Sequence, residues 1–142
     1  MNSKSNYIIF GVIIALALVY AFFFRTPSDS ELDFGIDALC ISGDGYSYTL
    51  DYDAIDRIGL VEAPDYGTEV SGGNSGSITY GTWENADWGT YTRATNDNVD
   101  SAITVFGTDG TVTVFNYQSD SDTGNMYTAF ASLLNGNDSG AE

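Results

Sequence analysis

Two groups of acidic residues are the first candidates for chemistry in this chain. Asp51, Asp53 and Asp56 lie close together, and Asp97 and Asp100 form a second group. Carboxylate oxygens are the ligands that Ca²⁺ prefers, and paired carboxylates can hydrolyse a glycosidic bond. Neither group, however, has the ligand spacing, the glycine and the final glutamate of an EF-hand loop. We therefore expect solvated acidic turns at both places, and neither a specific metal site nor a catalytic pair.

The chain has few other groups that could catalyse a reaction. It has no histidine, the side chain that most often serves as a general base. Its single cysteine, Cys40, lies among apolar neighbours, where a small buried side chain is more common than a reactive thiol. A lone cysteine also excludes a disulfide within the chain. The composition therefore predicts a protein that is not an enzyme and that holds no cofactor.

Four aromatic residues around a glycine-rich centre form the candidate interaction surface. They are Tyr80, Trp83, Trp88 and Tyr91. Such rings can stack on a sugar, contact another protein, or fill a hydrophobic core, where each buries roughly 150–250 Å². Core packing is the commonest of these roles, and the other two stay open as alternatives.

The charge of the chain excludes whole classes of partner. It has 20 Asp and Glu against 4 Lys and Arg, and its formal net charge is −16 at pH 7. Nucleic acids and anionic lipid headgroups are repelled by such a surface, because binding to phosphates needs basic side chains. Aromatic residues make up 14% of the chain, which predicts a folded domain, since disordered acidic chains are poor in them.

An apolar segment near the N-terminus predicts a membrane anchor. Residues 7–24 are almost all apolar, and a helix of this length spans about 27 Å, close to the roughly 30 Å hydrocarbon core of a bilayer. No small-x-small cleavage site follows it, so we expect an uncleaved single-pass anchor rather than a signal peptide. Lys4 precedes the segment, and acidic residues follow Arg25 on its other side. The positive-inside rule then places the N-terminus in the cytoplasm and the domain outside it, by a margin of one charge.

The rest of the chain has the residue pattern of a small β domain that ends in a helix. Asp44-Gly45 and Asp109-Gly110 are typical of hairpin turns, and Asp51-Tyr52-Asp53-Ala54 of a turn or a single helical turn. The glycine-rich residues 64–76 predict a loop. Alternation of apolar and polar residues predicts about seven strands, at residues 36–42, 46–51, 55–61, 77–83, 89–93, 102–106 and 112–117.

The C-terminal pattern changes from alternation to helical spacing. Apolar residues recur at a helical period between Met126 and Leu134, with Ser121 or Asp122 as the expected N-cap. Asn135-Gly136 predicts the end of the helix. The resulting boundaries are an anchor at residues 1–25, a polar stalk at 26–34, a β domain with its C-terminal helix at 35–135, and a disordered acidic tail at 136–142.

Several segments resemble the bacterial pleckstrin-homology-like domains. Residues 51–58 (DYDAIDRI) are similar to the segment after the second strand of that family, and residues 72–91 are similar to its glycine-punctuated centre. Val114-Phe115-Asn116, followed by Asp122-Thr123 and the pairs Met126-Tyr127 and Leu133-Leu134, resembles its closing strand and helix. The resemblance covers roughly residues 35–134. It implies a seven-stranded antiparallel barrel or sandwich closed by one C-terminal helix, and no catalytic residues.

One departure from that family limits what the resemblance implies. Its eukaryotic phosphoinositide-binding members hold the headgroup with Lys and Arg around the first hairpin, where this chain has Asp44. We therefore expect no phosphoinositide binding. The expected function is a membrane-anchored, non-enzymatic interaction module outside the cytoplasm, which contacts a membrane or envelope protein through a strand edge or the groove beside the terminal helix. The alternative is an acidic surface domain that binds cell-wall glycan or divalent cations, and a carboxylate hydrolase is the weakest of the three hypotheses.

Overall fold

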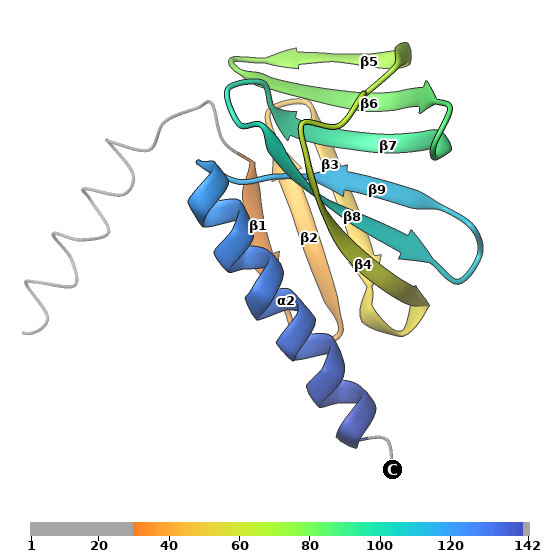
Figure 1. Ribbon diagram of the computed structural model, residues 1–142, viewed down its shortest axis with the longest axis vertical. Coiled ribbons are helices and arrows are strands. Elements are labelled where there is room, and N and C mark those ends of the chain that lie inside the picture. The colour runs from red at the N-terminus through yellow and green to blue at the C-terminus, as the bar shows by residue number, and fades with distance from the viewer. Residues whose placement is uncertain (1–29, 141–142) are drawn as a thin grey trace, which may run out of the picture.

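The computed structural model describes residues 30–140, and the side chains of residues 30–135. Within this range the chain is mostly β, with two sheets and one C-terminal helix, so the predicted fold class is confirmed at that level (Figure 1). The predicted membrane anchor, residues 1–25, lies outside the described residues.

The smaller sheet is an antiparallel meander of three strands. Its order is β1-β2-β3, and the hairpin predicted at Asp44-Gly45 joins the second strand to the third. Gly45 has a φ of +93°, which a side chain would disfavour at this turn. The bounds are β1 (Glu31–Phe34), β2 (Ala38–Gly43) and β3 (Tyr46–Asp51).

The first of these strands lies where a polar stalk was expected. The stalk was predicted to run to residue 34, but Glu31–Phe34 pairs with β2. Leu32 and Phe34 alternate with two exposed acids and pack against the hydrophobic core. Four residues are too short a segment for this alternation to stand out beside the proline and serines before it.

The larger sheet has six strands in the order β4-β8-β9-β7-β6-β5. A single turn of 3₁₀ helix, η1 (Tyr52–Ala54), joins β3 to it, as the sequence predicted. The strand β9 lies between β8, with which it pairs antiparallel, and β7, with which it pairs parallel. The bounds are β4 (Ile55–Glu62), β5 (Thr68–Ser75), β6 (Ile78–Asn85), β7 (Gly89–Asn96), β8 (Ser101–Gly107) and β9 (Val112–Phe115).

The described residues therefore form nine strands instead of about seven, and one strand pair is parallel. Besides β1, the additional strand is β5, which lies in the expected loop at residues 64–76. Its glycines belong to the strand: Gly72 faces Gly81 on β6, and a Cβ on either residue would collide with the backbone of the other strand. Glycine thus allows a close approach of two strands here, where the sequence pattern indicated a break.

The helix α2 (Asp120–Gly140) begins slightly earlier than predicted and continues further. The Ser119 hydroxyl accepts a hydrogen bond from the Asp122 amide at 3.0 Å, so Ser119 is the N-cap rather than the expected Ser121 or Asp122. The expected end at Asn135-Gly136 is wrong, because the backbone stays helical to Gly140. Asparagine and glycine weaken a helix without always ending it, which explains why this signal failed.

Two hydrophobic clusters lie on opposite faces of the larger sheet. The first cluster fills the space between that sheet, the smaller sheet and α2, and Phe130 of the helix is at its centre with no exposed surface. The rings of Phe34, Tyr52 and Phe115 surround Phe130 at centroid distances of 5.4 to 6.4 Å. The second cluster covers the outer face and contains Tyr91, Ala102, Val112 and Val114.

A buried amide holds the loop between β7 and β8. The side-chain oxygen of Asn116 accepts a hydrogen bond from the Asn96 amide at 2.6 Å. Its Nδ2 donates to the carbonyl oxygens of Asn96, Val99 and Ser101 at 3.2, 3.4 and 3.2 Å. Asn116 is 2% exposed, so these bonds take the place of water at the backbone groups that its side chain reaches.

Candidate functional site

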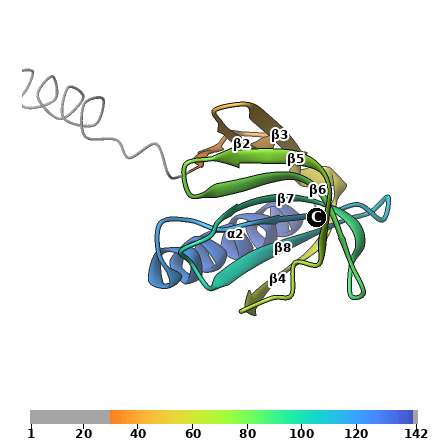
Figure 2. The same ribbon diagram turned by 90° about the horizontal axis from the view of Figure 1, so that it is seen from above.

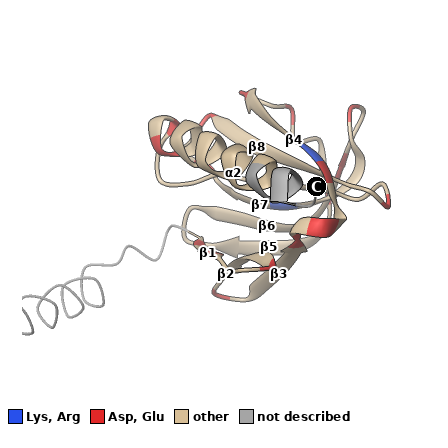
Figure 3. Ribbon diagram, turned by 90° about the horizontal axis from the view of Figure 1, so that it is seen from below, with Lys and Arg blue, Asp and Glu red and all other residues tan. Residues whose placement is uncertain are grey.

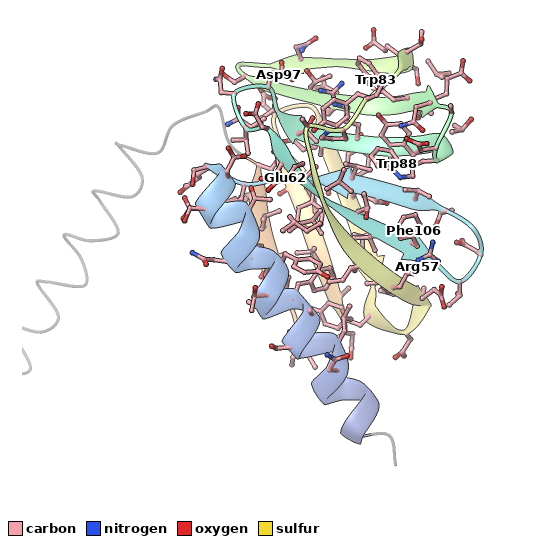
Figure 4. The ribbon with its side chains drawn as sticks, in the orientation of Figure 1. Arg57, Glu62, Trp83, Trp88, Asp97 and Phe106 are labelled. Carbon is pink, nitrogen blue, oxygen red and sulfur yellow. The ribbon has the colours of Figure 1, made fainter. Side chains whose placement is uncertain are left out.

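Three of the four predicted aromatic residues come together on the outer face of the larger sheet. Trp83 on β6 lies directly across from Tyr91 on β7. Trp88, in the turn between these strands, packs edge-to-face on Tyr91 with ring centroids 5.1 Å apart (Figure 4). Tyr91 is buried, and both tryptophans are half-buried in the second cluster. These rings therefore serve mainly as packing on this face.

The fourth aromatic residue lies on the other side of the sheet. Tyr80 stacks on Tyr46 of the smaller sheet, with ring centroids 4.7 Å apart, and contacts the first hydrophobic cluster. It is three residues from Trp83 on the same strand, and side chains an odd number of residues apart point to opposite faces. The structure thus separates Tyr80 from Trp83, Trp88 and Tyr91.

A buried cation, Arg93, lies among the outer rings and was not predicted as part of any site. Its guanidinium carbon is 3.6 Å from the centroid of Tyr66 and 4.4 Å from that of Trp83. Burial lowers its pKa, while Tyr66, Tyr91 and Asp97 act in the opposite direction. Arg93 shares a strand face with Tyr91, two positions earlier, which is the signal in the sequence that could have revealed it.

The loop between β4 and β5 covers this outer cluster. Tyr91 donates a hydrogen bond through its hydroxyl to the Tyr66 carbonyl at 2.7 Å, and Asn85 donates through Nδ2 to the Asp65 carbonyl at 2.8 Å. Burial raises the pKa of Tyr91 to about 12, and so its hydroxyl stays protonated and keeps donating at physiological pH. The outer aromatic cluster is consequently closed by the protein itself.

The two acidic groups that the sequence singled out lie in different places and differ in their contacts. Asp51, Asp53 and Asp56 are exposed around η1 and the start of β4. The Asp97 carboxylate accepts hydrogen bonds from the Thr79 hydroxyl at 2.8 and 2.9 Å and from Arg93 at 3.3 Å. Within residues 30–140, no three or more His, Cys, Asp or Glu side chains form a group that could hold a metal ion.

One of the two edges of the larger sheet is the outer side of β4, and the other is that of β5 (Figure 2). The strand β4 pairs with β8 on one side, and no described strand pairs with its other side. The Ala63 amide donates to the Asp100 carbonyl at 2.9 Å, so these two residues form a hydrogen-bonded pair. In an antiparallel ladder only every second residue of a strand bonds to a given neighbour. Backbone groups of Gly59 and Val61 therefore face β8, and those of Ile58, Leu60 and Glu62 face outward.

A groove lies beside the first half of this edge, and we call it the α2 groove. It has a volume of about 450 Å³ and separates η1 and the start of β4 from residues 127–135 of α2. Apolar side chains from both walls line it, with charged residues around them. The apolar members are Ile55, Ile58, Tyr127, Ala131 and Leu134, and the charged members are Asp53, Asp56 and Arg57.

A second hollow, the acidic pocket, lies at the other end of the same edge. Its volume is about 300 Å³, and Glu62, Asp100 and Asp120 line it together with Leu60. Figure 4 shows Arg57 and Glu62 at opposite ends of β4. Sequence reasoning missed this pocket, because its carboxylates come from three separate elements: β4, the loop before β8 and the first turn of α2.

Asp120 also has a structural role that predicts a pH effect. Its carboxylate accepts hydrogen bonds from the amide and the hydroxyl of Ser101 at 2.8 and 2.9 Å, and these bonds lower its pKa. A depressed pKa stabilises the fold above the unfolded-state value of about 3.9, and this stabilisation is lost as the pH falls through the folded-state value. We expect Asp120→Asn to unfold at lower urea concentration than the wild type at pH 7, with the difference shrinking in acid. Equal differences at both pH values would contradict this, and Asp44→Asn in the first hairpin is the matched control.

Comparisons with protein-family models, with curated proteins and with solved structures each found no match. Among residues 30–140, no helix is long and apolar enough to cross a membrane. The geometry of the β4 edge and its two hollows is therefore the basis for a functional proposal.

Proposed function

We propose that this chain is a non-enzymatic interaction module, tethered to the membrane by residues 1–25, whose β domain binds a membrane or envelope protein outside the cytoplasm. The single observation that carries the proposal is the unpaired edge of β4 between the α2 groove and the acidic pocket. The partner contributes an extended segment that adds a strand to this edge, as in other cases of β-strand addition.

The edge has the properties that strand addition needs. Outward backbone groups of Ile58, Leu60 and Glu62 offer hydrogen bonds, and the hollows on either side of Leu60 accept alternate side chains. Leu60 is 42% exposed, so part of its side chain is accessible to a strand added at this edge. A register shift between Ile55 and Arg57 bends the strand at its start, so the straight part of the edge begins after it.

The tether and the family resemblance support the location of this module. The apolar residues 7–24 are long enough for an anchor, and acidic residues follow them on the side of the domain. A mostly β domain closed by a C-terminal helix is the plan that the resemblance to bacterial pleckstrin-homology-like domains implies. The parallel pair β7–β9 departs from that plan, and so we propose the family relation only as a distant one.

Two exposed apolar residues on opposite edges of the sheet allow a matched cross-linking test. Leu60 is on β4 and Val70, 55% exposed, is on β5. With a photoreactive amino acid at either position of the full chain in its native membrane, we expect a defined adduct with one envelope protein at position 60 and none at position 70. Equal labelling at both positions, or no adduct at 60, would count against the proposal.

Two proline substitutions distinguish the backbone groups that are available to a partner from those that hold β4 in the sheet. Glu62→Pro removes an amide that faces outward and leaves the photoreactive amino acid at position 60 in place, and so we expect it to abolish the adduct while changing stability by less than about 1 kcal/mol. Val61→Pro removes an amide of the β4–β8 ladder and is expected to destabilise the domain by about 1–3 kcal/mol. If both variants lose stability equally, the assignment of outward-facing groups is wrong. Chemical denaturation of the full chain measures the difference.

A further inference from the structure

The two hollows beside β4 lie on one face of the strand, at a fixed separation. Ile58 lines the α2 groove and Glu62 lines the acidic pocket, and side chains four residues apart on a strand share a face. Because a strand rises about 3.3 Å per residue, the two positions are roughly 13 Å apart. A strand added to the β4 edge places the residues opposite Ile58 and Glu62 on this same face.

The hollows differ in the side chains that they can accept. The α2 groove offers apolar side chains on both walls, Ile55 and Ile58 on one side and Tyr127 and Leu134 on the other, beside charged residues at its β4 end. The acidic pocket is lined by three acidic residues, of which Asp120 already accepts two hydrogen bonds from Ser101. The positive end of the α2 dipole, about half a charge, offsets only part of the remaining negative charge. Arg57 and Arg93 are the only basic residues in residues 30–140, and all but Asp29 and Glu142 of the 20 acids lie there (Figure 3). Arg57 is at the far end of β4, and Arg93 is buried on the other face of the sheet.

We infer that the segment bound on β4 carries an apolar side chain for the α2 groove and, four positions away, a Lys or Arg for the acidic pocket. This inference rests on the proposed strand addition and names the chemistry of the partner. The basic side chain provides selectivity, because an acidic side chain at the same position would meet three carboxylates. The apolar side chain is removed from water in a groove that the docked strand completes.

A second copy of this chain does not fit the same requirement. Two β4 strands paired antiparallel about Leu60 would place Ile58 opposite Glu62, so no cation would enter the acidic pocket. The two acidic domains would also repel each other across the contact. The charge of the site therefore favours a different, basic partner segment over self-association.

Binding of synthetic peptides to the full chain, embedded in zwitterionic nanodiscs, tests this inference. The probes are fluorescent ten-residue Val/Thr peptides in which one Leu and one Lys are four positions apart, in both orders. Control peptides have the same composition with a spacing of three, or have Glu in place of Lys. A shift by one residue moves a side chain to the other face of the strand. We expect one of the two orders at spacing four to bind at least about tenfold more tightly than every control, as measured by fluorescence anisotropy.

Two double variants that each remove two negative charges show whether the acidic pocket binds the basic side chain of the peptide. Neutralising the acidic pocket with Glu62→Gln and Asp100→Asn is expected to weaken the preferred peptide by about threefold to tenfold, as for exposed ion pairs. Glu69→Gln with Glu84→Gln makes the same change of charge on β5 and β6 and should leave the affinity unchanged. Equal binding of the spacing-three or Glu peptides, or no binding of any peptide, overturns the inference. If the adduct at position 60 is still formed in that case, the proposed function stands and only the partner chemistry is wrong.

Discussion

Replacing Phe130 with alanine is expected to lower the free energy of unfolding by about 3–5 kcal/mol, the largest effect of a single core truncation in this domain. The ring has no exposed surface and packs against residues of the smaller sheet, of η1 and of β9. No neighbouring element can close the resulting cavity without moving both sheets. Chemical denaturation of the full chain in detergent, followed by tryptophan fluorescence, measures the change.

Phe106→Ala is the matched control for this truncation. Phe106 is half-buried on the outer face, where the Arg57 guanidinium lies 4.1 Å from its ring centroid. Its ring packs on the outer cluster only and does not connect the larger sheet to the smaller sheet or to α2. We therefore expect a loss of only about 1–2 kcal/mol. Similar losses for the two variants would show that α2 is not held by the ring of Phe130, and the description of the first cluster as the main core would then be wrong.

Asn116→Asp is expected to destabilise the domain by about 3–5 kcal/mol at neutral pH, although it exchanges only one nitrogen for an oxygen. The Nδ2 group donates to three carbonyl oxygens, and an aspartate at this position would place a buried negative charge against them. Burial and the three carbonyls would raise the folded-state pKa of the new carboxyl above its unfolded value of about 3.9.

The sign of the pH effect follows from this raised pKa. The pH-dependent part of the destabilisation is complete above the folded-state pKa of the introduced carboxyl, decreases as the pH falls through it, and vanishes below the unfolded value. A protonated carboxyl can donate to only one of the three carbonyls, so we expect the gap between wild type and variant to narrow in acid. Asn98→Asp, an exposed substitution in the same loop, is the control and should show no such gap. A gap that is independent of pH would contradict the assigned hydrogen bonds.

The parts of the fold that the sequence predicted are those with local signals. Asp44-Gly45 and Asp109-Gly110 form the two expected hairpins, since their turns need residues that tolerate a positive φ. The helical spacing around Phe130 also indicated the correct face, because the same residues pack on the core. In these segments, the residues that decide the structure are neighbours in the chain.

The errors come from segments whose structure depends on distant partners. Glu31–Phe34 is a strand only because β2 pairs with it, and Thr68–Ser75 is a strand because Gly72 fits against Gly81. The parallel pairing of β7 with β9 has no local signature at all. The number of strands and their order were therefore beyond what alternation and turn residues could predict.

The candidate site was predicted in kind but not in its residues. A strand edge and a groove beside the last helix were expected, and the described residues place both along β4. The four aromatic residues chosen from the sequence instead pack on both faces of the sheet, because Tyr80 and Trp83 are an odd number of positions apart. The acidic pocket joins Glu62 to Asp100 and Asp120, a juxtaposition that only the folded chain creates.

The position of β9 has a consequence for the order in which the domain forms during synthesis. This strand is the only link between two halves of the larger sheet, β4 with β8 and β5 with β6 and β7, among the described strands. Until residue 115 has left the ribosome, neither half can join the other. During this interval each half of the sheet exposes an edge strand with unpaired backbone groups. Assembly of the larger sheet must therefore wait until β9 has been synthesised. A chaperone that covers these edge strands during this interval would raise the yield of the native domain.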